Sequence, residues 1–366
     1  MNRSLTTLTY FAISAMASYS QSLSVLHLTD LPALVEESSG LVAVNGELFT
    51  HNDSGGDPVL YSVDPQNGQV LREVWIANAQ NVDWEDVCAD DLYVYVGDIG
   101  NNNGNRQDLV IYKVAKSDFL NADTVQSEKI EFAYADQSSF SSNPLTNYDA
   151  EGLIALQGTL YLFTKNRGNL QCNVYAIPSM AGQFVVPAID QIASQGLITA
   201  ATTGGNGSLY LLGVDFNGPF LMYWPSAPSP TFSNKPHQRI NLQVPHAVQM
   251  EALWHNGAEL LLSTETEGGR PAALYQLAPG LNLNQESRVK STTVAFNSSD
   301  QHFYLNNPQQ KILKMDVWTV GGQAIYSKVG EEGENKIDAG LWASSTYFLR
   351  IQLAGGQEAI HRIVRP

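Results

Sequence analysis

Charged residues are scarce in this chain: Asp, Glu, Lys and Arg make up only 15% of its 366 residues. Within that small share, basic residues are fewer still, with 20 Lys and Arg against 36 Asp and Glu, and the formal net charge is −16. Binding to nucleic acid or to an anionic membrane depends on clustered Lys and Arg. The composition therefore argues against both partners and favours cations or neutral ligands such as glycans.

Cysteine is almost absent as well. Only Cys88 and Cys172 occur, too few for a small scaffold held together by disulfides. One disulfide between them is compatible with export. Two buried free thiols are the interpretation that we favour.

Long apolar runs are missing beyond the N-terminus, so no segment of the mature chain is expected to span a bilayer. The N-terminus reads MNRSLTTLTYFAISAMASYSQS, with Arg3 ahead of a moderately apolar stretch over 5–17 and small residues after it. This pattern is typical of a secretory signal peptide, with a short membrane anchor as the alternative. We predict a signal peptide over 1–20 and a mature protein that is secreted or held on the outer cell surface.

Catalytic and zinc-binding signatures are also lacking. The sequence contains no GxSxG and no HExxH, and its 7 histidines are scattered. The glycine-rich stretch GDIGNNNGNRQD at 97–108 has the spacing of neither an EF-hand, a GxGxxG loop nor a P-loop. We expect a tight loop there, in which Arg106 pairs with Asp98; binding of an anionic group by Arg106 is the alternative.

The chain does contain a repeat. Each copy opens with a short apolar run and continues with two further stretches of alternating, β-branched and aromatic residues bounded by turn residues. In four copies an acidic residue lies at or near the start of the run, and a fifth copy, GLITAATT from 196, has none. The four acidic copies begin EESSGLVAV at 36, DWEDVCAD at 83, DAEGLIAL at 149 and MEALWH at 250.

Repeats of roughly 45 to 65 residues, each with three or four antiparallel strands, are typical of a β-propeller. A single blade cannot bury both faces of its sheet, whereas blades stacked in a ring can. We predict an all-β chain with a β-propeller over 21–284, of five blades with a sixth left open, and a small C-terminal β-sandwich over 285–366. A β-sandwich with chance repetition is the alternative for the first segment.

The repeat also predicts where its acidic residues lie. In a propeller blade the first strand lines the axis and the second runs antiparallel to it, so the start of one and the end of the other meet at one mouth. The expected axial ring is Glu37 (or its neighbour Glu36), Glu85, Glu151 and Glu251. The expected second ring, from the ends of the second strands, is Asn52, Asp98, Asn166, Asp215 and Glu265, with Asp53 beside Asn52 and Lys165 beside Asn166.

Four converging carboxylates cannot stay ionised and unpaired at low dielectric, so the ring is expected to hold a cation. Ca²⁺ accepts about six to eight oxygen ligands, whereas Mg²⁺ demands a tight octahedron and zinc favours His and Cys. We therefore expect Ca²⁺. Two alternatives stay open: carboxylates that accept backbone N–H groups from neighbouring blades, and a water-filled channel.

A catalytic role is the alternative to simple binding. The stretch THNDSGGD from 50 places His51 beside Asp53 at the expected mouth, and a metal-assisted hydrolase needs such a base. One hypothesis is a calcium-binding module for extracellular glycans or small molecules. The other is a calcium-dependent hydrolase of phosphoesters, esters or lactones, with His51 and Asp53 as its candidate catalytic residues.

The C-terminal segment resembles the sorting domain of Bacteroidetes proteins exported by the type IX (Por) secretion system. The matching features are VWTVGGQ at 317–323, LWASSTYFLRI at 341–351 and a basic end. Thr346 stands where the family usually has Gly. The resemblance implies that this segment is a transport address read by the secretion machinery.

The repeat region is similar to a family of secreted bacterial propellers, through HNDSGGDPVLYSVDPQNGQV, DWEDV, YVGDIGNNNGNRQDLVIYKV and DAEGL. It is more distantly similar to esterase-like phytase propellers and to calcium-dependent nucleotidase or lactonase propellers, in which acids around the axis hold Ca²⁺. This resemblance implies an axial calcium site. It does not identify any catalytic residue in this chain.

Overall fold

The computed structural model describes residues 22–205, 207–227, 231–244, 249–257, 259–277, 293–297, 300–306, 312–319, 324–329, 336–353 and 358–365. The predicted signal peptide over 1–20 and the expected domain boundary at 284/285 lie outside these residues. The chain divides into two compact units, Met1–Leu281 and Asn282–Pro366.

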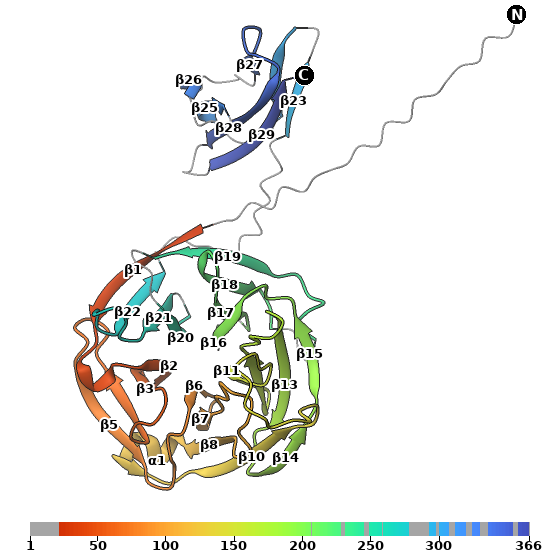
Figure 1. The fold of residues 1–366 in the computed structure, drawn as a ribbon. Coiled ribbons are helices and arrows are strands. Elements are labelled where there is room, and N and C mark those ends of the chain that lie inside the picture. Colours follow the sequence, from red (N-terminus) through yellow and green to blue (C-terminus); the bar gives the residue numbers. More distant parts are fainter. Residues whose placement is uncertain are drawn as a thin grey trace, which may run out of the picture. The chain divides into compact units, whose positions relative to one another are not determined.

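The described strands of the first unit fall into successive four-stranded antiparallel groups (Figure 1). The first group is β2 (Ser38–Val44), β3 (Glu47–Asn52), β4 (Val59–Val63) and β5 (Val70–Ile76); the second is β6 (Trp84–Ala89), β7 (Tyr93–Asp98), β8 (Val110–Ala115) and β10 (Glu128–Tyr134). The third is β11 (Ala150–Leu156), β12 (Thr159–Thr164), β13 (Cys172–Pro178) and β15 (Ala188–Ile192); the fourth is β16 (Leu197–Thr203), β17 (Leu209–Asp215), β18 (Gly218–Trp224) and β19 (Gln238–Gln243). The fifth is β20 (Met250–His255), β21 (Leu260–Thr264), β22 (Ala273–Leu277) and β1 (Ser22–Asp30).

The first strands of these groups form a closed ring around a central axis (Figure 1). Strand β2 contacts β6, β6 contacts β11, β11 contacts β16, β16 contacts β20, and β20 returns to β2. The N-terminal strand β1 completes the last group by pairing antiparallel with β22, and it also pairs parallel with β19. This arrangement is a β-propeller, which confirms the predicted fold.

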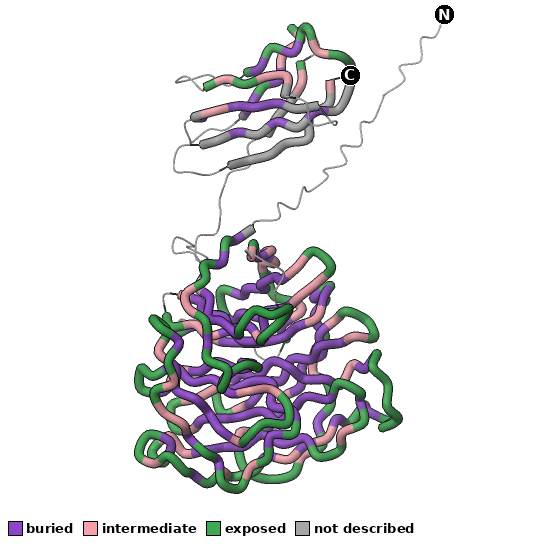
Figure 2. The backbone as a smooth tube through the Cα atoms, turned by 60° about the vertical axis from the view of Figure 1, so that its left-hand side comes forward, coloured by how far each residue is buried: buried purple, intermediate pink, exposed green. Residues whose placement is uncertain are grey.

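Burial follows the position of each strand in its group. The inner strands are buried on both faces, because neighbouring groups cover them, and β17 begins with five buried residues in a row. Outer strands alternate, as in β10, where Ile130, Phe132 and Tyr134 point inward between partly or fully exposed residues. Apolar layers lie between adjacent groups, and Figure 2 shows the buried positions gathered within the strands.

Short elements and edge strands complete the first unit. They are η1 (Ala33–Val35), α1 (Lys116–Asn121), β9 (Thr124–Val125), which pairs with β5, and β14 (Gly182–Val186), which pairs with β10. Cys88 and Cys172 are both free thiols. No helix in the described part of the chain combines the length and the apolar character needed to cross a bilayer.

The second unit is a small β-sandwich, as predicted. One sheet contains β23 (Thr293–Asn297), β24 (His302–Asn306) and β27 (Lys336–Asp338), and the other contains β25 (Ile312–Thr319), β26 (Ala324–Val329), β28 (Ser345–Leu353) and β29 (Glu358–Arg365). Phe303 and Ile337 of the first sheet share one buried cluster with Met315 and Leu349 of the second. This shared core joins the two sheets face to face.

Candidate metal centre

A β-bulge recurs at the same place in every innermost strand. Pairing between the first and second strands skips one residue in each group: Ser39, Glu85, Glu151, Thr199 and Glu251. A bulge bends the strand locally and re-aims the side chain of the extra residue. The five bulge positions are therefore structurally equivalent, and three of them carry a glutamate that is nearly fully buried.

Glu37, the expected fourth member of this ring, lies outside it. Glu37 is exposed and precedes β2, and its backbone N–H donates to Asn52 Oδ1 (3.2 Å). The equivalent bulge position is held by Ser39, whose hydroxyl donates to the backbone carbonyl of Glu85 (2.8 Å). The prediction aligned the nearest acid instead, two residues too early, because the first repeat has no acid at its bulge.

The acidic cluster predicted for the mouth is present, and it could hold a metal ion. Two sets of three carboxylates bring one oxygen from each residue within 4.8 Å of the others. The first set is Asp53, Asp83 and Glu85, and the second is Glu85, Asp149 and Glu151. Glu85 belongs to both, so it lies at the centre of the cluster.

The second set already has cationic partners within the protein. Lys165 Nζ lies 3.0 Å from Glu151 Oε2 and 3.9 Å from Glu251 Oε2. Arg167 pairs with Asp149, and its Nη2 lies 3.9 Å from Glu151 Oε1. Although burial alone would lower it, these carboxylates, Glu151 first, raise the pKa of Lys165 above its ordinary value. Lys165 therefore stays charged and neutralises this half of the mouth.

The first set has no such partner. Among the residues that the structure describes, Asp53, Asp83 and Glu85 form no ion pair with Lys or Arg, and Asp53 Oδ1 and Glu85 Oε1 are buried without a hydrogen-bond partner.. Gly100 lies against the set, and a Cβ at that position would overlap Glu85 Oε1 and Asp83 Oδ2. These two carboxylates can approach the backbone this closely only because residue 100 is glycine.

Burial and mutual repulsion raise the pKa values of these carboxyls. Burial and then Asp83 raise the pKa of Asp53 to about 8, and burial and then Asp149 raise the pKa of Asp83 to about 6. Burial, followed by Glu151, raises the pKa of Glu85 well above its usual range. Near neutral pH the set therefore keeps protons that a bound cation would displace.

The residues of the expected second ring have different roles in the structure. Asp98 pairs with Arg106 (Oδ1 to Nη2, 2.8 Å), which confirms the predicted pairing, and Asp215 pairs with Arg239 (2.6 Å). Burial, with Glu251 next, raises the pKa of Glu265 to about 7, so Glu265 belongs electrostatically to the mouth. The amides are structural: Asn52 donates to the Leu34 carbonyl (2.9 Å), and Asn166 Oδ1 accepts from the Thr164 hydroxyl (2.6 Å).

His51, the candidate general base, does not lie at the mouth. It is fully buried, and its ring packs edge-on against Trp84 with 5.6 Å between ring centroids. Its Nδ1 lies 3.0 Å from the Asn52 carbonyl oxygen, and burial lowers its pKa to about 4. Successive side chains of β3 alternate between its two faces, and His51 falls on the face covered by the second group. His51 and Asp53 therefore do not form an accessible catalytic pair.

Asp86, the neighbour of Glu85, serves the structure instead. It is fully buried; its Oδ2 accepts the backbone N–H groups of Leu153 (2.8 Å) and Ala201 (3.4 Å), and its Oδ1 accepts that of Val87 (2.8 Å). Leu153 and Ala201 lie on the innermost strands of the next two groups, whose axial N–H groups would otherwise lack a partner. The alternative expected for the ring, hydrogen bonding to neighbouring blades, is the role of Asp86.

Prediction from the sequence placed Lys165 at this mouth, but it missed four members of the site: Asp83, Gly100, Asp149 and Arg167. A signal for the two aspartates was present in the sequence, since each lies two residues before a bulge glutamate in a D-x-E pattern. Glu37 holds the same place relative to Ser39. Glu37 is thus the counterpart of Asp83 and Asp149, not of Glu85.

Comparison with known proteins adds a fold-level likeness only. No family model and no curated protein matches the sequence. Among solved structures, the chain is similar to glutaminyl cyclase from Myxococcus xanthus (12% identity, 70% of this chain and 97% of that chain covered, TM-score 0.44). It is also similar to the PQQ-bound aldose sugar dehydrogenase from Streptomyces coelicolor (14%, 69% and 97%, TM-score 0.37) and to regucalcin, a calcium-binding protein, from Agrobacterium tumefaciens (10%, 71% and 95%, TM-score 0.37).

Proposed function

We propose that this protein is an exported β-propeller binding module whose acidic mouth holds Ca²⁺. One observation carries the proposal: the buried Glu85 carboxylate has an oxygen without a hydrogen-bond partner, and it lies in one acidic set with Asp53 and Asp83. An unpaired carboxylate this deep costs several kcal/mol unless it is protonated or meets a cation. A cation at this position removes that cost.

The donor set favours calcium over other ions. Asp53, Asp83 and Glu85 offer only carboxylate oxygens, which suit hard cations, and no Cys or His belongs to either set. Ca²⁺ takes its ligands at about 2.3–2.6 Å, so oxygens on opposite sides of the ion lie up to about 5 Å apart. The 4.8 Å limit of the set is compatible with that spacing.

A calcium ion at a propeller mouth supports ligand binding directly. Three protein carboxylates fill part of a coordination shell of about six to eight oxygens, which leaves positions for ligand hydroxyl or carboxylate groups. Extracellular glycans and small oxygen-rich molecules carry such groups. The alternative of a calcium-dependent hydrolase loses its candidate base, because His51 is buried away from the mouth.

The C-terminal unit is proposed to act as the sorting domain. Its support is the resemblance of 317–323 and 341–351 to type IX sorting domains together with its compact two-sheet fold. Fusing 282–366 behind an exported reporter in a host with that secretion system should move the reporter to the cell surface. A reporter that stays in the periplasm, as it does without the tail, would count against this role.

Calcium titration of the mature chain tests the main proposal. We expect saturable calcium binding by calorimetry and a melting temperature that rises with calcium. Glu85→Gln, which removes the central charge, should lower the calcium affinity about ten-fold or more and reduce the rise in melting temperature. Glu37→Gln is the matched control: it changes an exposed glutamate at the same mouth and should leave binding intact. Calcium that leaves the melting temperature unchanged, or equal losses in both variants, would overturn the calcium site.

A further inference from the structure

A cavity of about 630 Å³ opens at the far end of the innermost strands, away from the acidic mouth. Within β6, Glu85 faces the mouth at the strand start, whereas Cys88 and Ala89 line the cavity at the strand end. Asp86 lies between them, and its two interstrand hydrogen bonds tie the strands together at that level. The volume is typical of a small-molecule site, and all five groups contribute to its wall.

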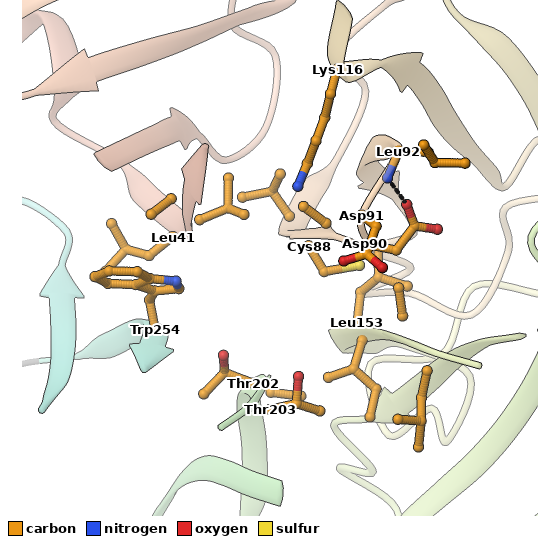
Figure 3. Close-up of a pocket in the computed structure, with 18 of the residues that line it drawn as sticks. Leu41, Cys88, Asp90, Asp91, Leu92, Lys116, Leu153, Thr202, Thr203 and Trp254 are labelled. Atoms are coloured by element: carbon orange, nitrogen blue, oxygen red, sulfur yellow. Dashed lines mark hydrogen bonds between the residues drawn. The ribbon is translucent and has the colours of Figure 1, made fainter. Parts of the chain in front are cut away.

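Two opposite charges line this cavity without partners. Figure 3 shows the Lys116 side chain reaching into it, and neither Lys116 Nζ nor the Asp91 carboxylate makes a hydrogen bond or an ion pair with any described residue. Asp90, next in the chain, differs, because its carboxylate accepts the N–H groups of Leu92 and Tyr93 and the hydroxyl of Tyr95 (2.8 Å each). Asp90 therefore stabilises the hairpin, whereas the charged groups of Asp91 and Lys116 remain available to a ligand.

The remaining wall combines an apolar face with small hydroxyl groups. Trp254, Leu41 and Leu153 provide the apolar part, and Thr202 and Thr203 lie across the cavity from Lys116 (Figure 3). Lys116 is one of only 20 basic residues in a chain with a net charge of −16. The combination selects a ligand with a negative group, a positive group and an apolar part.

We propose that this cavity binds a free α-amino acid with an apolar side chain. Its carboxylate pairs with Lys116, its ammonium group with Asp91, and its side chain packs against Trp254 and Leu153. A ligand with one charge satisfies only one of the two groups, and an uncharged ligand satisfies neither, although both would lose water on binding. This site is independent of calcium at the acidic mouth.

Calorimetric titration with L-phenylalanine and L-leucine tests the site, using L-phenylalaninamide and N-acetyl-L-phenylalanine as probes that each lack one charge. We expect both modified probes to bind about ten-fold or more weakly than L-phenylalanine. In Lys116→Gln, L-phenylalanine should no longer bind more tightly than L-phenylalaninamide. In Asp91→Asn, L-phenylalanine should no longer bind more tightly than N-acetyl-L-phenylalanine.

Two controls separate this site from general effects. Lys129→Gln makes the same change on an exposed lysine of β10, and Glu37→Gln removes an exposed charge ahead of β2; both should leave amino-acid binding unchanged. Absence of saturable binding of both amino acids to the wild-type chain overturns the proposal. So does binding in which the amide and N-acetyl probes match the free amino acid.

Discussion

At the scale of single residues, Glu85 and Asp86 show how one bulge separates two tasks. Both are buried carboxylates on β6, one residue apart in the sequence. The bulge at Glu85 turns its side chain toward the mouth, whereas Asp86 accepts backbone N–H groups from two neighbouring strands. Of these two carboxylates, Glu85 is therefore the one that keeps an oxygen free for a cation.

Gly100 offers a direct test at this scale. Gly100→Ala places a methyl group in the space beside Glu85 and Asp83, so we expect calcium affinity to fall about ten-fold or more. Melting curves without calcium measure any general loss of stability, because both carboxylates must move away from the new Cβ. Gly205→Ala, in a loop where a Cβ meets nothing within 4 Å, is the matched control for calorimetry. Unchanged calcium affinity in Gly100→Ala would place the ion elsewhere.

At the scale of elements, the innermost strands are held together across the axis by side chains as well as by apolar layers. Their inner edges carry N–H groups that no further strand can reach, since each blade begins at the axis. Asp86 of β6 accepts such groups from β11 and β16. The hydroxyl of Thr199 on β16 donates to the Met250 carbonyl of β20 (2.8 Å), which extends the same kind of link to the next blade.

Removing Asp86 should weaken this link. Asp86→Ala leaves the Leu153 and Ala201 N–H groups buried without an acceptor, and we expect a loss of about 2–4 kcal/mol in the free energy of unfolding. Asp86→Asn keeps one acceptor oxygen and should cost less than half as much. Urea denaturation measures both, with Asp91→Ala as the exposed control. Equal free energies of unfolding for Asp86→Ala and the wild type would show that these hydrogen bonds do not contribute to stability.

At the scale of the whole molecule, most of the net charge of −16 is spread over the surface, but one end of the axis concentrates it in a buried cluster. Lys165 and Arg167 neutralise one half of that cluster. The other half has no cation of its own among the described residues. The folded propeller therefore contains buried carboxylates whose negative charge must be neutralised by protons or by a metal ion.

This imbalance predicts how stability depends on pH. Asp53, Asp83 and Glu265 have folded-state pKa values of about 8, about 6 and about 7, against about 4 in an unfolded chain. Between about pH 4 and pH 8 the cation-free folded state binds more protons than the unfolded state, so stability falls as pH rises through that window. Bound calcium should make stability less dependent on pH in this window, because the ion takes the place of the protons on these carboxyl groups.

Melting curves recorded with calcium and with a chelator across this range measure the effect. Asp53→Asn should also flatten the fall in the chelator, since it removes the carboxyl with the highest of the three pKa values. A chelated wild type that grows more stable between about pH 5 and pH 8 would contradict the charge imbalance.

The propeller fold and the glutamates of three bulges could be predicted from the sequence. Alternating strands, turn residues and repeated openings are local patterns, and a repeat places equivalent residues at equivalent points of a ring. Glu85, Glu151 and Glu251 were found in this way. The prediction was wrong at Glu37 because the first repeat has a serine, Ser39, at its bulge, so the acid two residues earlier was aligned in its place.

Only the tertiary structure decided which charges meet. Lys165, Arg167 and Asp149 lie within reach of the ring glutamates because neighbouring strand ends converge there. Packing between groups decided that His51 is buried and that Asp86 links strands rather than binding an ion. Lys116 and Trp254 are far apart in the chain and share one cavity only because the ring closes. Local sequence sets the strands and their buried faces, whereas distances across the axis exist only in the assembled ring.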